Sequence, residues 1–377
     1  MSTTFDRLAE LASTPAAALD MLIETMRAEK NYHRMFDALM LKKKHEFGLP
    51  LLRPTSLNDV PADKRDEFER AYVAGARQAG QAFLNDGNIA DAWLYFRTIQ
   101  EKEPIAAVLA QTDLPEDYEK AQELINIALY EGANPVRGLQ FLLKTNGTCN
   151  TITSLDQAMP TMAPEDRKQA AALLVRHLYD ELLQNVQADV QKRMPFAPPA
   201  ASLRELILGR DWLFQDGNYH VDVSHLNSVT RFSRFLDAGS AELALSLQLA
   251  EYGSRLDQNL QYGGEVPFQD FYAAHTHYFE ILLSQNVEEA TSYFQQKLDH
   301  EPDEPDRQMI AYVLVDLLMK SGRIDAAMPI AERHLKFLEE PQFSFAELCQ
   351  KAGRKDAWAE AAKEKGDLVG FAAALLS

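Results

Sequence analysis

The sequence predicts an all-α protein, an α-solenoid of antiparallel helix pairs with one short β-hairpin inserted near residues 213–223. Apolar residues recur at helical spacing through most of the 377 residues, and short breaks rich in glycine, asparagine or proline separate these runs. A further observation is a turn glycine that precedes a close-packing alanine by five positions. This pair occurs at Gly87/Ala92, Gly239/Ala244 and Gly322/Ala327.

The clearest repeat unit runs from Gly80 to Pro104. It combines Gly80-x2-Phe83 on one helix with Ala92-x3-Phe96 on the next. Small residues let two helices approach closely, an aromatic ring fills the space between them, and the final proline cannot continue a helix. The second half recurs as Ala290-x3-Phe294-x7-Pro302. The unit resembles a tetratricopeptide repeat. This resemblance implies stacked helix pairs that bind a protein or peptide on a concave face.

The domain organisation follows from the breaks between helical runs. Residues 1–47 are expected to form an N-terminal helical pair, because Thr14-Pro15 is a typical helix start. Pro50, Pro54 and Pro61 mark 48–63 as an extended connector. Residues 64–194 are expected to form a first block of helical repeats. A proline-rich break at 195–201 precedes a second block at 202–377.

The hairpin is predicted from the stretch between Trp212 and Val223. Asp216-Gly217 stands at its centre, between apolar flanks that alternate with period two. Asp-Gly favours the tight turns that join two antiparallel strands. This is the one part of the sequence that indicates strands.

Composition and charge limit the classes of partner. The net charge is −18, and since residues 1–80 hold 12 basic and 12 acidic residues, the whole excess follows residue 80. A surface of this sign repels phosphate backbones and anionic lipids, so neither nucleic acid nor a membrane is expected as a partner. The basic run Lys42–Lys44 is expected to stabilise the C-terminal end of a helix before Gly48.

The sequence favours a cytoplasmic protein. The N-terminus has an early acidic residue and lacks the apolar core of a secretory signal. No apolar run approaches the roughly 20 residues needed to cross a bilayer. The two cysteines, Cys149 and Cys349, are far apart in the sequence, as suits a reducing compartment.

The sequence favours a non-enzymatic scaffold that binds a partner protein or peptide in a helical groove. It has no phosphate-binding loop, no dinucleotide-binding glycine pattern, no paired-cysteine zinc spacing and no His-Glu-x-x-His. We therefore expect no cofactor.

An alternative is a metal-dependent or acid-base enzyme with a site between His177 and Glu280. Five of the nine histidines lie from His177 to His277, each beside carboxylates. Imidazole and carboxylate side chains are the groups that bind divalent metals or act as an acid-base pair. In the simpler interpretation, Asp222 and Ser224 cap a helix and the imidazoles fill polar gaps. The candidate metal ligands are His220, Asp222, His225, His275, His277 and Glu280.

Overall fold

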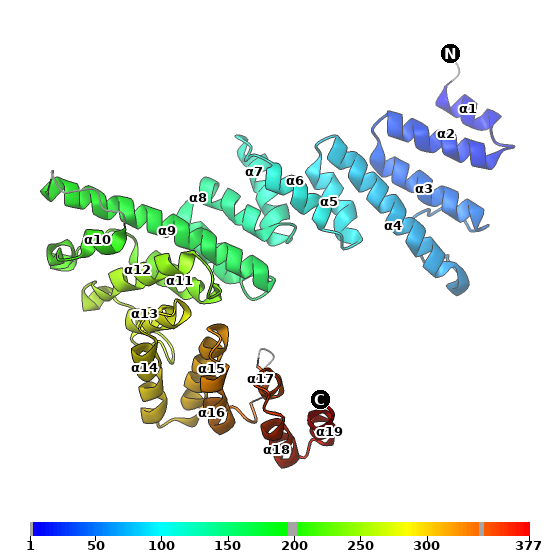
Figure 1. Ribbon diagram of the computed structural model, residues 1–377. Helices are drawn as coiled ribbons and strands as arrows, with labels where there is room; N and C mark the ends of the chain where they lie inside the picture. Colours follow the sequence, from blue (N-terminus) through cyan, green and yellow to red (C-terminus); the bar gives the residue numbers. More distant parts are fainter. Residues whose placement is uncertain (1–2, 195–201, 339–342) are drawn as a thin grey trace. The chain divides into compact units, whose positions relative to one another are not determined.

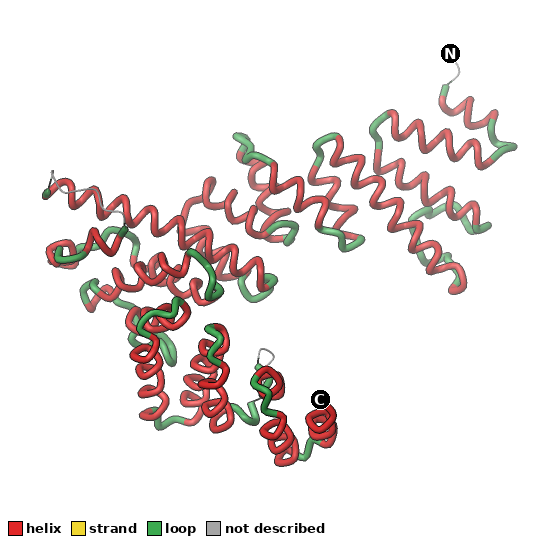
Figure 2. The backbone as a smooth tube through the Cα atoms, viewed as in Figure 1, coloured by secondary structure: helices red, strands yellow, loops and turns green. Residues whose placement is uncertain are grey.

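The computed structural model describes residues 3–194, 202–338 and 343–377. Within these ranges the regular secondary structure is helical, without an extended strand, and isolated β-bridge residues occur at Gly263, Asp270 and Phe343; Gly263 pairs with Asp270 (Figures 1 and 2). The predicted all-α class is confirmed. The chain forms two compact units, Met1–Thr151 and Ile152–Ser377.

Unit 1 is a succession of helices in which each packs against the next along the chain from α2 to α6. The predicted N-terminal pair is α2 and α3, and α1 precedes it. A π-helical turn, Asn126–Tyr130, extends α7. The helices are α1 (Thr4–Glu10), α2 (Pro15–Ala28), α3 (Tyr32–Glu46), α4 (Ala62–Asn85), α5 (Ile89–Thr98), α6 (Glu103–Gln111), α7 (Tyr118–Ile125) and α8 (Pro135–Ala158), the last of which continues into unit 2.

The close contact predicted for the repeat unit is present between α4 and α5. Ala92 and Phe96 are fully buried. A Cβ atom added to Gly80 would lie 2.8 Å from Cε2 of Phe96, so the glycine lets the ring reach the backbone of α4. Pro104 has a different role from the predicted one, because α5 ends at Thr98 and Pro104 lies in the first turn of α6.

The connector between α3 and α4 folds around a buried lysine. As predicted, α3 ends just before Gly48 with lysines in its last turn. Lys44 is fully buried there, and its Nζ donates to the carbonyl of Arg53 at 2.6 Å and to Asp59 at 3.3 Å. The connector therefore has a fixed path over the end of α3, set by one ammonium group.

Unit 2 is built on the long helix α9, against which α10, α11 and α12 pack; from α12 onward each helix packs against the next. The helices are α9 (Pro164–Arg193), α10 (Leu203–Ile207), α11 (Val223–Phe232), α12 (Glu242–Ser254), α13 (Phe271–Leu282), α14 (Val287–His300), α15 (Glu304–Lys320), α16 (Ile324–His334), α17 (Phe345–Lys351), α18 (Lys355–Lys365) and α19 (Leu368–Leu376).

The two units divide at Thr151, inside the stretch 64–194 that the sequence indicated as one block. Gly147 lies just before this point and interrupts α8 with a backbone that is not helical (φ 77°, ψ 179°). The proline-rich break predicted at 195–201 lies outside the described residues.

The predicted β-hairpin at 213–223 is wrong. Residues Asp211–Gly217 form a 3-10 helical segment. Asp216 and Gly217 do adopt the positive φ of a tight turn, 59° and 71°, but the flanks do not pair with each other. The backbone of His220 instead donates to the Tyr252 hydroxyl of α12, while its carbonyl accepts from Asn185 of α9. Helix side chains thus bind the groups that a strand ladder would have used.

One turn geometry closes many of the helices. A residue with positive φ follows the helix and donates its N–H to the carbonyl three positions earlier. The next residue donates its N–H to the carbonyl five positions before it, so the two bonds satisfy two free carbonyls at the helix end. Gly87 and Gly322 are such turn glycines, as the repeated pattern predicts, whereas Gly239 is not. This turn occurs at Lys30, Gly48, Gly87, Gln100, Ser284, Gly322, Gly353 and Gly366.

Across the described ranges, none of the helices combines the length and the apolar character that a membrane crossing demands.

Candidate functional site

His220 lies in a hydrogen-bonded chain between α9 and α12. Its side chain is 5% exposed. Its Nδ1 is 2.9 Å from the Tyr252 hydroxyl and its Nε2 is 3.3 Å from Oδ2 of Asp189. A carboxylate only accepts, so in the neutral imidazole Nε2 carries the proton and Nδ1 accepts from Tyr252. These contacts hold the loop after Gly217 against the two helices.

Asp222 caps α11, as the simpler interpretation of the sequence predicts. One carboxylate oxygen accepts from the backbone N–H groups of Ser224 and His225 at 2.8 and 3.3 Å. The hydrogen bond from the Ser224 hydroxyl is the main cause that lowers the pKa of Asp222. His225 therefore meets Asp222 through its backbone.

His275 is fully buried in α13, among aromatic rings. The ring centroids of Phe268 and Phe271 lie 4.4 and 4.3 Å from that of the imidazole. Nδ1 donates to the Phe271 carbonyl at 2.7 Å, and Nε2 has no hydrogen-bond partner within the described ranges. Burial lowers the pKa of His275 to about 3, with a smaller contribution from Arg234. This imidazole is neutral at pH 7.

His277 and Glu280 form a separate pair on another side of α13. Nδ1 of His277 donates to Oε2 of Glu280 at 2.9 Å. The other oxygen of Glu280 accepts from Asn286 at 2.7 Å, and the Tyr293 ring lies 4.4 Å from the imidazole. His177 is 3.8 Å from Glu181 on α9.

The structure thus brings the side chains of His277 and Glu280 together. Asp222 meets only the backbone of His225, while His220 and His275 have partners outside the candidate set. Among the residues that the structure describes, no three His, Cys, Asp or Glu side chains are grouped so that they could hold a metal ion. A metal at these residues stays a prediction without geometric support.

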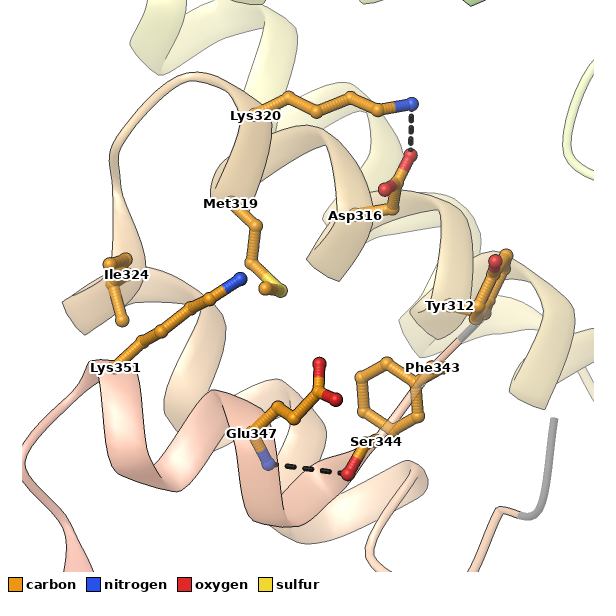
Figure 3. Close-up of a pocket in the computed structure, with 9 residues that line it drawn as sticks. All are labelled: Tyr312, Asp316, Met319, Lys320, Ile324, Phe343, Ser344, Glu347 and Lys351. Atoms are coloured by element: carbon orange, nitrogen blue, oxygen red, sulfur yellow. Dashed lines mark hydrogen bonds and ion pairs between the residues drawn. The ribbon is translucent and has the colours of Figure 1, made fainter. Parts of the chain in front are cut away.

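A cavity of about 360 Å³ lies in unit 2 between α15 and α17 (Figure 3). Glu347 and Lys351 point into it from α17. Lys320 and Asp316 form an ion pair of 2.7 Å on the opposite wall. Burial opposes the charge of Lys320, yet Tyr278 and Asp316 raise its pKa to about 12. The cavity holds two cations and two anions, so its charges balance. The rest of its lining is Tyr312, Met319, Ile324, Phe343 and Ser344.

A larger groove of about 620 Å³ lies in unit 1, where α2 and α3 meet α4. Its lining has two arginines, three side-chain amides and no acidic residue, above an apolar floor. Tyr32 and Met35 of α3 form that floor and are buried. The residues of α4 that line the groove recur every three to four positions, so they lie on one face of that helix. The lining residues are Arg27, Tyr32, Met35, Ala74, Arg77, Gln78, Gln81, Ala82 and Asn85.

The two arginines of the groove are half-exposed and carry outward ion pairs. Arg27 lies 2.7 Å from Glu24, and Arg77 binds both carboxylate oxygens of Glu101. Side-chain exposures of 43% and 52% for the arginines place both pairs in solvent. Such pairs contribute about 0–1 kcal/mol, so a competing carboxylate can replace them at little cost.

Comparison of the chain with models of protein families, with curated proteins and with solved structures finds no match in any of the three. The resemblance to tetratricopeptide repeats therefore stays a prediction.

Sequence reasoning did not find the groove, although the sequence carries a signal for it. From Arg70 to Asn85 the chain has no Asp or Glu, in a protein with a net charge of −18. Arg77, Gln78, Gln81 and Asn85 recur at helical spacing within that stretch. A polar face without acidic residues on one helix indicates a surface with a different role from the rest.

Proposed function

We propose that the chain is a non-enzymatic protein-interaction module, a cytoplasmic tetratricopeptide-like solenoid that holds an extended, acidic peptide segment of a partner along α4. The observation that carries the proposal is the groove of unit 1, whose lining combines amides and arginines without any carboxylate. Its volume is in the range typical of ligand pockets.

The amides on α4 suit a peptide backbone. Gln78, Gln81 and Asn85 each carry a donor and an acceptor, as a peptide group does. Gln81 donates to Asn85 at 3.0 Å, which leaves one N–H of Gln81 and the amide N–H groups of Asn85 for a ligand. They span seven helical positions, about 10 Å at 1.5 Å per residue. An extended chain rises about 3.3 Å per residue, so the row matches about three residues of peptide. Tyr32 and Met35 supply an apolar floor for one side chain of that segment.

The arginines favour acidic side chains on the partner. Arg27 and Arg77 lie on either side of the groove's lining, on α2 and α4. When a peptide carboxylate reaches Arg77, the arginine gives up its solvent-exposed ion pair with Glu101. It then forms an ion pair with the peptide, and the peptide partly shields that pair from solvent. Charge-assisted hydrogen bonds of this kind contribute about 1.5–3 kcal/mol.

The test measures fluorescence anisotropy with three labelled pools of ten-residue peptides, rich in Asp/Glu, rich in Lys/Arg, or uncharged. We expect the acidic pool to bind most tightly. Arg77→Glu should weaken that binding by about tenfold, the equivalent of 1.4 kcal/mol. Arg65→Glu is the matched control, since Arg65 is an exposed arginine on α4 outside the groove.

A second variant separates backbone recognition from charge. Gln78→Ala combined with Gln81→Ala should weaken the acidic and uncharged pools by similar factors, because both share the same backbone. Preference for the basic pool, or equal losses in the Arg77 and Arg65 variants, would contradict the proposal. Absence of binding by all three pools would contradict it as well.

A further inference from the structure

Two charged groups in the cavity of unit 2 lack an ion-pair partner among the described residues that line it. Asp316 and Lys320 are paired with each other at 2.7 Å. The carboxylate of Glu347 and the ammonium of Lys351 also point into the cavity, but no ion pair joins either group to any residue drawn there (Figure 3). The peptide groove of unit 1 does not explain these two groups.

The two unpaired charges are held apart on one helix. Glu347 and Lys351 are four positions apart on α17, so they share a face and their backbones are about 6 Å apart along the helix axis. The Ser344 hydroxyl accepts from the N–H of Glu347 at 3.2 Å, which fixes the start of this helix. Exposed charges at this spacing gain little from direct contact in water. A ligand that bridges them therefore displaces no strong bond.

The surroundings of Glu347 favour an ammonium group. In Figure 3 the Glu347 carboxylate lies on the same side of the cavity as Phe343, which belongs to the lining together with Tyr312. The rings of Tyr312 and Phe343 meet edge to face, with their centroids 6.1 Å apart. The face of an aromatic ring attracts a cation. A carboxylate and two rings thus favour a positive charge at this end of the cavity.

The rest of the cavity suits a small molecule with an apolar part. Met319 and Ile324 belong to the lining on the side where Lys351 enters (Figure 3). Asp316 and Lys320 neutralise each other on the opposite wall, so that wall selects neither sign of charge. A volume of about 360 Å³ is at the lower end of the range for ligand pockets.

We propose that this cavity binds a free α-amino acid with an apolar side chain. The ammonium group of the ligand donates to Glu347, its carboxylate accepts from Lys351, and its side chain contacts Met319 and Ile324. In an α-amino acid the nitrogen and the carboxyl carbon are bonded to one carbon and lie about 2.5 Å apart. With a hydrogen bond at each end, the ligand spans the roughly 6 Å between the two positions on α17.

A ligand with both charges is required by the two unpaired groups. A simple carboxylate would leave Glu347 without a partner, and a simple amine would do the same to Lys351. The site lies entirely within unit 2, so it is independent of the peptide groove of unit 1.

Isothermal titration calorimetry of the full chain at pH 7 tests the proposal with three probes of similar shape. The probes are L-leucine, 4-methylpentanoate, which lacks the ammonium group, and 3-methylbutylamine, which lacks the carboxylate. We expect L-leucine to bind with a Kd of about 1 mM or below. Each analogue with a single charge should bind at least about tenfold more weakly, because it pairs with only one of the two groups.

Substitutions on α17 locate the site. Glu347→Gln and Lys351→Met should each weaken the binding of L-leucine by about tenfold; both side chains belong to exposed residues, so the fold is preserved. Glu360→Gln and Lys355→Met are the matched controls on α18, since both residues are exposed and lie outside the cavity. They should bind as the wild type does, and so should Arg77→Glu in the groove of unit 1.

Three results would overturn the amino-acid site. One is a wild type that binds no L-leucine at about 10 mM. Another is an analogue with a single charge that binds as tightly as L-leucine, because the cavity would then recognise a plain carboxylate or amine. The third is an equal loss of affinity in the α17 variants and in their α18 controls.

Discussion

Because His275 is buried in its neutral form, we expect the free energy of unfolding to fall in mild acid. In the folded chain its imidazole is fully buried beside Phe268 and Phe271, and burial lowers its pKa to about 3. In the unfolded chain the pKa is about 6.5. Between these two values the unfolded state binds a proton that the folded state does not, so the free energy of unfolding falls as the pH falls.

The magnitude follows from the two pKa values. From pH 7 to pH 5 the unfolded imidazole becomes almost fully protonated while the folded one stays neutral. The free energy of unfolding should fall by about 2 kcal/mol over this interval through His275 alone, at about 1.4 kcal/mol per pH unit once the pH is below 6.5. This fall of about 2 kcal/mol requires only that the pKa of His275 in the folded chain lies well below 5. The loss continues toward pH 3.

The variant His275→Leu isolates this contribution. Leucine is close to histidine in volume, and Nε2 has no partner within the described residues, so its removal leaves nothing unsatisfied there. The Phe271 carbonyl that accepts from Nδ1 is four residues earlier on the same helix and keeps its helical bond. At pH 7 we expect the variant to be within about 1 kcal/mol of the wild type.

The assay compares urea unfolding of both proteins at pH 7 and pH 5. All other titrating groups are common to the two chains, so the difference between their pH effects belongs to His275. We expect the variant to lose about 2 kcal/mol less than the wild type. An equal pH dependence in both proteins would refute the reasoning, because it would mean that the imidazole is already accessible to protons in the folded state.

Three further predictions concern packing and thiol reactivity. Ala92→Leu should lower the free energy of unfolding by about 1–3 kcal/mol, visible as a lower melting temperature, because Ala92 is fully buried at the contact of α4 and α5; an unchanged melting temperature would contradict that contact. Lys44→Met should cost about 1.5–3 kcal/mol through its lost charged hydrogen bonds, and thermolysin should then cut residues 49–61 faster than in the wild type. One thiol should react with an exposed-thiol reagent at pH 8 in the native chain and two in urea, because Cys149 is exposed while burial raises the pKa of Cys349 to about 11; two fast thiols in the native protein would argue against the packing of α17.

Helix positions were predictable because their signals are local. Pro15 begins α2, where Thr14-Pro15 indicates a helix start in the sequence. Gly322 ends α15 with the positive φ that its place in the repeated pattern implies. A proline in the first turn or a glycine after the last one acts through its own backbone, so distant residues change it little.

The partners that the residues of the predicted hairpin and of the candidate histidine site take in the fold depend on residues far away in the sequence. Asp216-Gly217 makes the turn that its sequence predicts, but Tyr252 and Asn185 decide what the flanking backbone binds. The buried state of Lys44 was equally hidden, because a basic residue near a helix end is normally solvated. Such features depend on which helix arrives from elsewhere in the chain, and spacing along the sequence does not encode that.

The recurrent helix-ending turn leaves the chain room to evolve. At Lys30, Gln100 and Ser284 a residue with a side chain adopts the left-handed conformation, with φ near 57°, which costs an L-residue about 1–2 kcal/mol. Glycine would relieve that strain, offset in part by its greater freedom in the unfolded chain. Substitution by glycine at the three turns should therefore add stability without altering the groove of unit 1. That margin of stability would let the groove accumulate destabilising substitutions while the fold persists.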